Sequence, residues 1–272
     1  MKKIFLFLFF WIFCFSNERI VLLSPALNEI VFALGKCENI VGNTAHSDYP
    51  EKSKKIYKIG GYFSPSLEKI VSLNPTLVIM QENELKTKKE LEKLGINTLM
   101  IEITSIKSIQ KAILDMGNRL GAKEKASEIS KKIDKAILSL KALPRTDKKI
   151  LIVFGMEKEI PKDIYIAGNN LYFSEMIELA GVKNAFFSTS AKQPVLSLEG
   201  LISLNPEILI VLSPFSKKMQ ISKDEIKKTW ASLPINAAKK GSIYVIDEDY
   251  SSMPSDRIVL FLDHFRKIIE ND

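Results

Sequence analysis

The chain offers few side chains of the kinds that usually carry out catalysis or hold a metal. Its 272 residues contain two histidines, His46 and His264, and two cysteines. Two histidines are too few for a zinc or manganese site of the multi-histidine type, and a Ser-His-acid triad would have to use one of them. The nucleophile elbow, the P-loop, the HExxH motif and the glycine-rich dinucleotide fingerprint do not occur in the sequence. The pattern therefore favours a protein that is not an enzyme and holds no resident cofactor.

Two glutamates stand out because they recur at equivalent positions of an internal repeat. The segment 66–79 (SLEKIVSLNPTLVI) returns as 197–210 (SLEGLISLNPEILI), with eight identical positions. Each copy predicts a helix, a Leu-Asn-Pro break and a buried parallel strand, because the residue before a proline is pushed out of the α region. Two copies are too few for a solenoid. They predict instead two lobes of similar topology, with Glu68 on the outer face of one and Glu199 on the outer face of the other.

Short apolar runs alternate with helical patterns around this repeat, which is typical of α/β proteins with parallel strands. We predict strands at 19–23, 40–42, 77–80, 98–101 and 149–154, and helices at 27–34 and 84–94.

The middle of the chain has a different character. From 105 to 143 there is no proline, and Ile129, Ile133 and Ile137 fall on one helical face. This pattern predicts a helix of about twenty residues from Ala122, preceded by a shorter one. We therefore divide the chain into an N-terminal lobe at 17–104, a helical connector at 105–146 and a C-terminal lobe at 147–272. A surface helix of one large domain would show the same periodicity and stays the alternative.

The first sixteen residues are typical of a secretory signal. Two lysines precede an unbroken apolar run at 4–15, which is shorter than the ~20 residues that a membrane span needs. Cys14 and Ser16 place small side chains at the −3 and −1 positions of a cleavage site. We expect a cleaved signal peptide at 1–16, with an uncleaved anchor as the alternative. Phe13 precedes Cys14 at the position where a lipoprotein signal has a small residue, so lipid anchoring is not expected.

The charge pattern and the cysteine count disfavour a nucleic-acid-binding protein and a disulfide-bonded fold. The formal net charge is +7, and two of these charges lie in the signal segment. The other lysines are scattered along helical faces with few aromatic residues among them, which disfavours a nucleic-acid partner. After cleavage only Cys37 remains, so no disulfide can form within one chain, and Cys37 is expected to be a small apolar residue.

Several segments together resemble one known family. They are 24–29 (SPALNE), 47–50 (SDYP), 67–79, 166–170 (IAGNN), 179–184 (LAGVKN) and 246–250 (IDEDY). In order and spacing they are similar to the vitamin B12, haem and ferric-siderophore binding proteins of ABC importers, over about 19–269. The resemblance implies an α/β fold of two Rossmann-like lobes with parallel sheets, joined by a single long helix, with a ligand cleft between the lobes. Open α/β sheets bind ligands beyond the carboxyl ends of their strands, which agrees with that location.

The resemblance also implies a function. It predicts a monomeric periplasmic receptor that captures a bulky iron chelate (a ferric siderophore or haem) or cobalamin and delivers it to the ABC importer permease in the inner membrane. Glu68 and Glu199 would then dock onto arginines of the permease, although each glutamate also suits the N-terminal turn of its helix. An exported hydrolase on an α/β scaffold is the alternative function.

The ligand residues are expected mainly from aromatic side chains near strand ends, since flat rings suit a corrin, a porphyrin or a catecholate. Our candidates are Tyr49, Tyr62, Phe63, Met156, Asn169, Phe215, Tyr250 and Arg257. Arg257 would bind an acidic group bidentately. We expect no metal site, and iron ligation by His46, Tyr49 or Tyr62 only if the ligand is haem. The sequence departs from cobalamin-binding relatives, which carry cleft tryptophans, because only Trp230 lies outside the signal segment.

Overall fold

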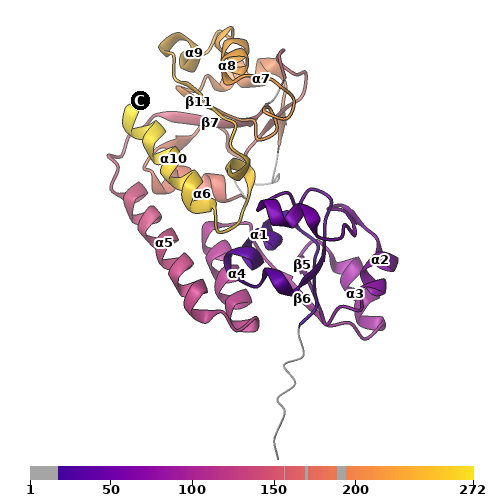
Figure 1. Cartoon of the computed structure of the whole chain (residues 1–272). Helices are drawn as coiled ribbons and strands as arrows, with labels where there is room; N and C mark the ends of the chain where they lie inside the picture. The colour runs from indigo at the N-terminus through magenta and orange to yellow at the C-terminus, as the bar shows by residue number, and fades with distance from the viewer. Residues whose placement is uncertain (1–17, 156, 169–170, 189–193) are drawn as a thin grey trace, which may run out of the picture.

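The computed structural model describes residues 18–155, 157–168, 171–188 and 194–272. Two α/β lobes lie at opposite ends of the molecule, and a pair of helices runs along one side of both (Figure 1). The signal segment, Met156 and Asn169 lie outside the described residues. No helix of the described part is both long and apolar enough to cross a membrane.

The N-terminal lobe is built on a parallel sheet. Its strand order is β2 (Ile40–Asn43), β1 (Ile20–Leu22), β5 (Leu77–Gln81) and β6 (Thr98–Ile101). The helices of this lobe are α1 (Pro25–Ala33), α2 (Leu67–Ser72) and α3 (Leu85–Lys93). A parallel sheet covered by helices on both faces buries its strands completely, which explains why β1 and β5 read as continuous apolar runs.

The C-terminal lobe has a mixed sheet. Its order is β10 (Val195–Leu196), β8 (Ile164–Ile166), β7 (Lys149–Phe154), β11 (Ile208–Leu212) and β12 (Ile243–Ile246), and β9 (Lys183–Asn184) also pairs with β7. The central strands β7, β11 and β12 are parallel, as expected, whereas β8 and β10 run antiparallel at one edge. The helices are α6 (Tyr172–Leu179), α7 (Leu198–Leu204), α8 (Lys223–Ala231), α9 (Asn236–Lys240) and α10 (Ile258–Asn271).

The internal repeat folds in the same way in both lobes. Ser66 accepts a hydrogen bond from the backbone N–H of Lys69 at the start of α2, and Ser197 accepts one from Gly200 at the start of α7. An asparagine with φ of 45° follows each helix, Asn74 after α2 and Asn205 after α7. The short polar side chain of asparagine tolerates this left-handed conformation. A buried strand then follows in each copy.

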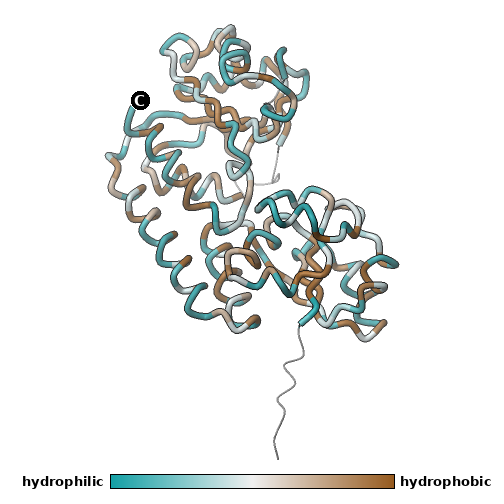
Figure 2. The backbone as a smooth tube through the Cα atoms, viewed as in Figure 1, coloured by the Kyte–Doolittle hydropathy of each residue, from teal (hydrophilic) through white to brown (hydrophobic). Residues whose placement is uncertain are grey.

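Two helices connect the sheets. α4 (Ile106–Arg119) begins with a capping box at Ser105, and α5 (Lys123–Lys141) carries the chain toward the C-terminal lobe. One continuous hydrophobic cluster includes side chains of β1, α4, α5 and α10, for example Ile20, Ile113 and Phe261. In Figure 2 apolar colour lies along the strands of both lobes, while α5 alternates between polar and apolar positions. The lobes therefore share packed core, which favours small relative motions.

The described part of the chain also has three short 3-10 helices, at Cys37–Asn39, Glu51–Lys55 and Asp249–Ser252, and a short hairpin of β3 (Gly60–Gly61) and β4 (Ser64–Pro65). The α/β fold of two lobes is confirmed. The numerical limits that we assign to the lobes and the connector stay a prediction.

Candidate ligand-binding site between the lobes

A pocket of about 550 Å³ lies where the two lobes face each other. Its lining comprises Ser24, Pro25, Ala26, His46, Gly61, Tyr62, Phe63, Ser64 and Gln81 from the N-terminal lobe, and Phe215, Met253 and Pro254 from the C-terminal lobe. Several of these residues follow the carboxyl ends of parallel strands, where α/β sheets bind ligands. The size and the largely apolar and aromatic lining suit a small-molecule site.

A tight hairpin carries the aromatic side chains of the N-terminal wall. β3 (Gly60–Gly61) pairs with β4 (Ser64–Pro65), and Tyr62 and Phe63 lie at the tip between them. Gly60 has φ of 125°, and a Cβ there would lie 2.7 Å from the carbonyl oxygen of Ser64. Only glycine fits this turn. The rings of Tyr62 and Phe63 meet edge to face with their centroids 4.6 Å apart, and Phe63 is 87% exposed.

Hydrogen bonds fix the orientation of Tyr62. Its hydroxyl donates to Oε1 of Gln81 at 3.1 Å, and Nε2 of Gln81 donates to the Ser24 hydroxyl at 2.6 Å. Gln81 is the last residue of β5 and Ser24 follows β1, so two strand ends hold the tyrosine in place. Sequence reasoning missed Gln81, although its position at the end of a buried strand is a signal that the strand-end rule could have used.

The other candidates on the pocket wall are Phe215 and His46. Phe215 is 48% exposed and faces the hairpin from the C-terminal lobe. His46 is exposed on the wall of the N-terminal lobe. Within the described residues no three His, Cys, Asp or Glu side chains come together as metal ligands. The structure thus brings together Tyr62, Phe63, Phe215 and His46.

Three further candidates do not line the pocket. The ring of Tyr49 lies over the guanidinium of Arg257, with 3.6 Å from the guanidinium carbon to the ring centroid. The Tyr250 hydroxyl is 3.3 Å from Nδ1 of His264 in α10. The ligand-binding roles of Tyr49, Tyr250 and Arg257 stay predictions, and those of Met156 and Asn169 fall outside the described part of the chain.

Arg257 instead joins the two lobes through a buried ion pair. Its guanidinium donates to both carboxylate oxygens of Glu29 in α1, with 3.0 Å from Nε to Oε2, and to Asp249 at 2.7 Å. The Ser255 hydroxyl also donates to Glu29. Burial alone would lower the pKa of Arg257, but the hydrogen bonds to Glu29 and Asp249 outweigh it and raise this pKa. Burial raises the pKa of Glu29, and the hydrogen bond from Arg257 opposes this shift. The ion pair thus joins α1 of the N-terminal lobe to the C-terminal lobe.

Asp256 lies beside this pair and makes the stability of the protein depend on pH. One of its carboxylate oxygens is buried without a hydrogen-bond partner. Burial, followed by the negative charge of Glu29, raises the pKa of Asp256 to about 6. A carboxyl whose pKa is higher in the folded state binds more protons when folded, so its contribution to stability is lost as pH rises from about 4 to about 6.

We expect Asp256→Asn to raise the free energy of unfolding by about 1–3 kcal/mol at pH 7.5, because the amide carries no charge to desolvate. The gain should be small near pH 4, where the aspartate is protonated in the folded state and about half protonated in the unfolded state. Urea unfolding at a series of pH values measures it, with the exposed Asp224→Asn as the control. An equal effect of Asp256→Asn at pH 4 and at pH 7.5 would refute this account.

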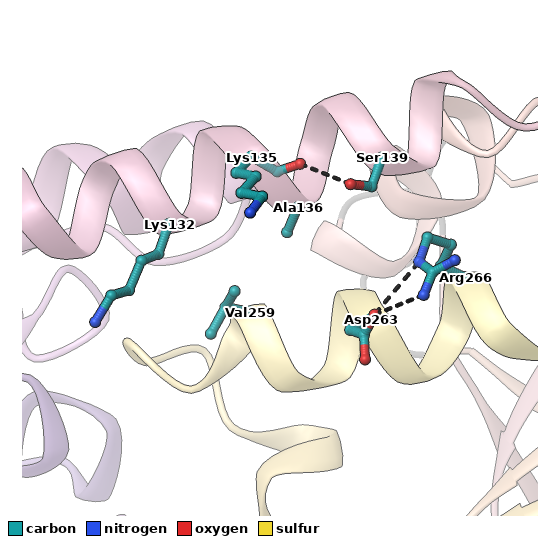
Figure 3. Close-up of a pocket in the computed structure, with 7 residues that line it drawn as sticks. All are labelled: Lys132, Lys135, Ala136, Ser139, Val259, Asp263 and Arg266. Carbon is teal, nitrogen blue, oxygen red and sulfur yellow. Dashed lines mark hydrogen bonds and ion pairs between the residues drawn. The ribbon is translucent and has the colours of Figure 1, made fainter.

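A second, smaller pocket of about 270 Å³ lies between α5 and α10 (Figure 3). Its lining is Lys132, Lys135, Ala136, Ser139, Val259, Asp263 and Arg266, without an aromatic side chain. Asp263 is already paired with Arg266 at 2.9 Å. This pocket lies on the helical side of the molecule and draws on neither sheet, so the aromatic pocket between the lobes is the better candidate site.

The two repeat glutamates lie apart from both pockets. Glu68 and Glu199 are exposed in the first turns of α2 and α7. Both helices lie on the side of the molecule opposite α5 (Figure 1). Hydrogen bonds from the backbone N–H of Glu199 and from Ser197 lower the pKa of Glu199, so it is ionised at neutral pH. Each lobe thus carries one exposed carboxylate in the first turn of a helix on that side.

Comparison with known proteins defines the class of this fold and site. The periplasmic binding protein family matches residues 20–250, and the chain belongs to this family. The Vitamin B12-binding protein of Vibrio parahaemolyticus is 26% identical, with 98% of each chain covered. YvrC of Bacillus subtilis, named as an uncharacterised ABC transporter substrate-binding lipoprotein, is 27% identical over 89% of this chain and 76% of its own.

A solved structure supports the same assignment. The periplasmic haem-binding protein RhuT from Roseiflexus sp. RS-1 has 25% identity and a TM-score of 0.76, covering 93% of this chain and 98% of its own. These relatives are binding proteins, so this chain is a binding protein and not an enzyme. The alternative of an exported hydrolase finds no support among them.

Proposed function

We propose that this protein is the extracytoplasmic receptor of an ABC importer and that it captures a bulky, ring-bearing chelate in the pocket between its lobes. The candidate ligands are haem, a ferric siderophore or cobalamin. The observation that carries the proposal is the aromatic pocket formed by Tyr62, Phe63 and Phe215 at strand ends of both lobes. Flat aromatic faces bind conjugated macrocycles and catecholates well. The names of the relatives, a vitamin B12-binding and a haem-binding protein, point to the same ligand classes.

The proposal includes export and delivery. The segment 1–16 acts as a cleaved signal peptide, and the mature chain works as a monomer in the periplasm. Glu68 and Glu199 dock onto the membrane permease, since two exposed carboxylates on one side of a rigid receptor give a defined register. YvrC is named a lipoprotein, which weighs against our expectation that lipid anchoring is absent. Phe13 before Cys14 is the feature that favours an unanchored chain.

The test is a titration of residues 17–272 with haemin, cyanocobalamin and a panel of ferric siderophores. Binding to the folded state alone stabilises it by about 2.7 kcal/mol at a ligand concentration of 100 times Kd. We therefore expect one ligand class to raise the melting temperature by about 5–10 °C. Absorbance changes should give a one-to-one stoichiometry. If every ligand leaves both the melting curve and the absorbance unchanged, the ligand class is wrong.

A further inference from the structure

A second ion pair joins the lobes, at the edge of the pocket where Phe215 and His46 lie. Nζ of Lys218 is 2.7 Å from Oδ2 of Asp48. Lys218 follows Phe215 in the loop after β11 and lies 5.8 Å from its ring centroid. Asp48 follows His46 in the loop after β2. Because Phe215 and His46 line opposite walls of the pocket, the ion pair links those walls.

The two interlobe ion pairs differ in their surroundings. The side chains of Arg257 and Glu29 are 7% and 3% exposed, whereas those of Lys218 and Asp48 are 63% and 38% exposed. Exposed pairs contribute little stability, and a competing anion can take the place of the carboxylate at the lysine. A buried pair cannot exchange in this way, since its separated charges would stay in the protein interior. The link between Arg257 and Glu29 is therefore fixed, and the link between Lys218 and Asp48 is exchangeable.

The charges around Asp48 are mostly positive. The hydrogen bond from Lys218 is the main reason that the pKa of Asp48 lies below its ordinary value, and Lys58 and Lys54 lower it further. Lys58 is held by Asn43 and by backbone carbonyls. The neighbouring Lys217 pairs with Asp247 instead. Lys218 is thus the cation whose partner an incoming anion can most easily replace.

We propose that Lys218 recognises a carboxylate on the edge of the ligand and that Asp48 occupies this place until the ligand arrives. This inference rests on the proposed function and narrows the cargo to a macrocycle with free carboxylates. Haem carries two such groups at one edge, whereas the side chains of the cobalamin ring are amides. A haem bound between Tyr62 and Phe215 would present its carboxylates to Lys218. Lys218 would then leave the carboxylate of Asp48 and pair with a carboxylate of the haem.

The test compares haemin with its dimethyl ester, in which both carboxylates are blocked. Lys218→Met is expected to weaken haemin binding about tenfold, because one charge-assisted hydrogen bond is lost. Asp48→Asn is expected to tighten it severalfold, because the internal competitor is removed. For the ester, neither substitution should change Kd by more than about twofold. Lys217→Met serves as the matched control, with Kd for both compounds as in the wild type.

The outcomes separate this inference from the proposed function. If Lys218→Met weakens the binding of haemin and of the ester equally, or weakens neither, carboxylate recognition by Lys218 is wrong. That outcome leaves the proposed capture of a macrocycle in the pocket standing. Tight binding of cyanocobalamin but not haemin by the wild type also overturns carboxylate recognition by Lys218. If the wild type binds none of the four ligands, which are haemin, its ester, cyanocobalamin and ferric siderophores, the proposed function fails. The side chains of Lys218 and Asp48 are 63% and 38% exposed, so melting curves close to that of the wild type are expected for every variant.

Discussion

Replacing Arg257 with methionine is expected to lower the free energy of unfolding by about 3–5 kcal/mol, because it leaves the buried Glu29 carboxylate without its partner. Glu29 is 3% exposed and loses both hydrogen bonds from the guanidinium. The substitution also removes the cation that lies over the ring of Tyr49. Urea unfolding at pH 7.5, followed by far-ultraviolet circular dichroism, measures the effect.

The double variant Glu29→Met with Arg257→Met tests the cause. Removing both charges eliminates the uncompensated carboxylate, and replacing a buried ion pair with apolar residues is often neutral or stabilising. We expect the double variant to regain at least half of the lost stability. Arg145→Met is the control, because it removes an arginine that is exposed at the surface. If the double variant is as unstable as the single one, packing rather than charge explains the loss.

Alanine at both Glu68 and Glu199 is expected to abolish ligand uptake by cells that depend on this receptor, while Kd for the ligand stays within about twofold of the wild type. Both carboxylates are exposed in short helices away from the pocket, so neither the fold nor the binding site should change. Each single substitution should reduce uptake less than the double one, since the other lobe keeps its contact.

The matched control replaces two exposed acidic residues at other places in the same lobes, Glu82→Ala and Asp224→Ala. This control should support uptake at the wild-type rate. Uptake is measured with radiolabelled ligand, and binding with the purified receptor, so that transport and capture are separated. Normal uptake by the Glu68 and Glu199 double variant would show that the repeat glutamates do not dock.

Most of the longer helices and strands were predictable from the sequence. The strands at 77–80 and 149–154 were predictable because parallel strands that are buried on both faces require continuous apolar runs. The repeat predicted two similar lobes because its proline-bounded helices recur before buried strands. The sequence also predicted a helical connector, and α5 begins one residue after Ala122. The antiparallel strands β8 and β10 were missed, since runs of two or three residues carry too little periodicity.

The candidate site was predictable only in part. Tyr62 and Phe63 were candidates because they follow Gly60 and Gly61 in a loop that was expected to face the cleft, and both line the pocket. The pairing of Arg257 with Glu29 was not predicted, because Glu29 is far away in the sequence and contacts Arg257 only when the lobes pack together. For the same reason Met253 and Pro254, which follow a short 3-10 helix, gave no signal that they would line the pocket.

The central claim is that a macrocycle is captured between the lobes. Its most direct test is calorimetric titration of a variant that lacks the three aromatic side chains of the pocket. Tyr62→Ala, Phe63→Ala and Phe215→Ala together are expected to weaken binding of the identified ligand at least about 100-fold. A control with alanine at the exposed residues Tyr57, Leu138 and Tyr165, which lie outside the pocket lining, should bind as the wild type does. Unchanged affinity of the first variant would contradict the account, because the ligand would then bind elsewhere.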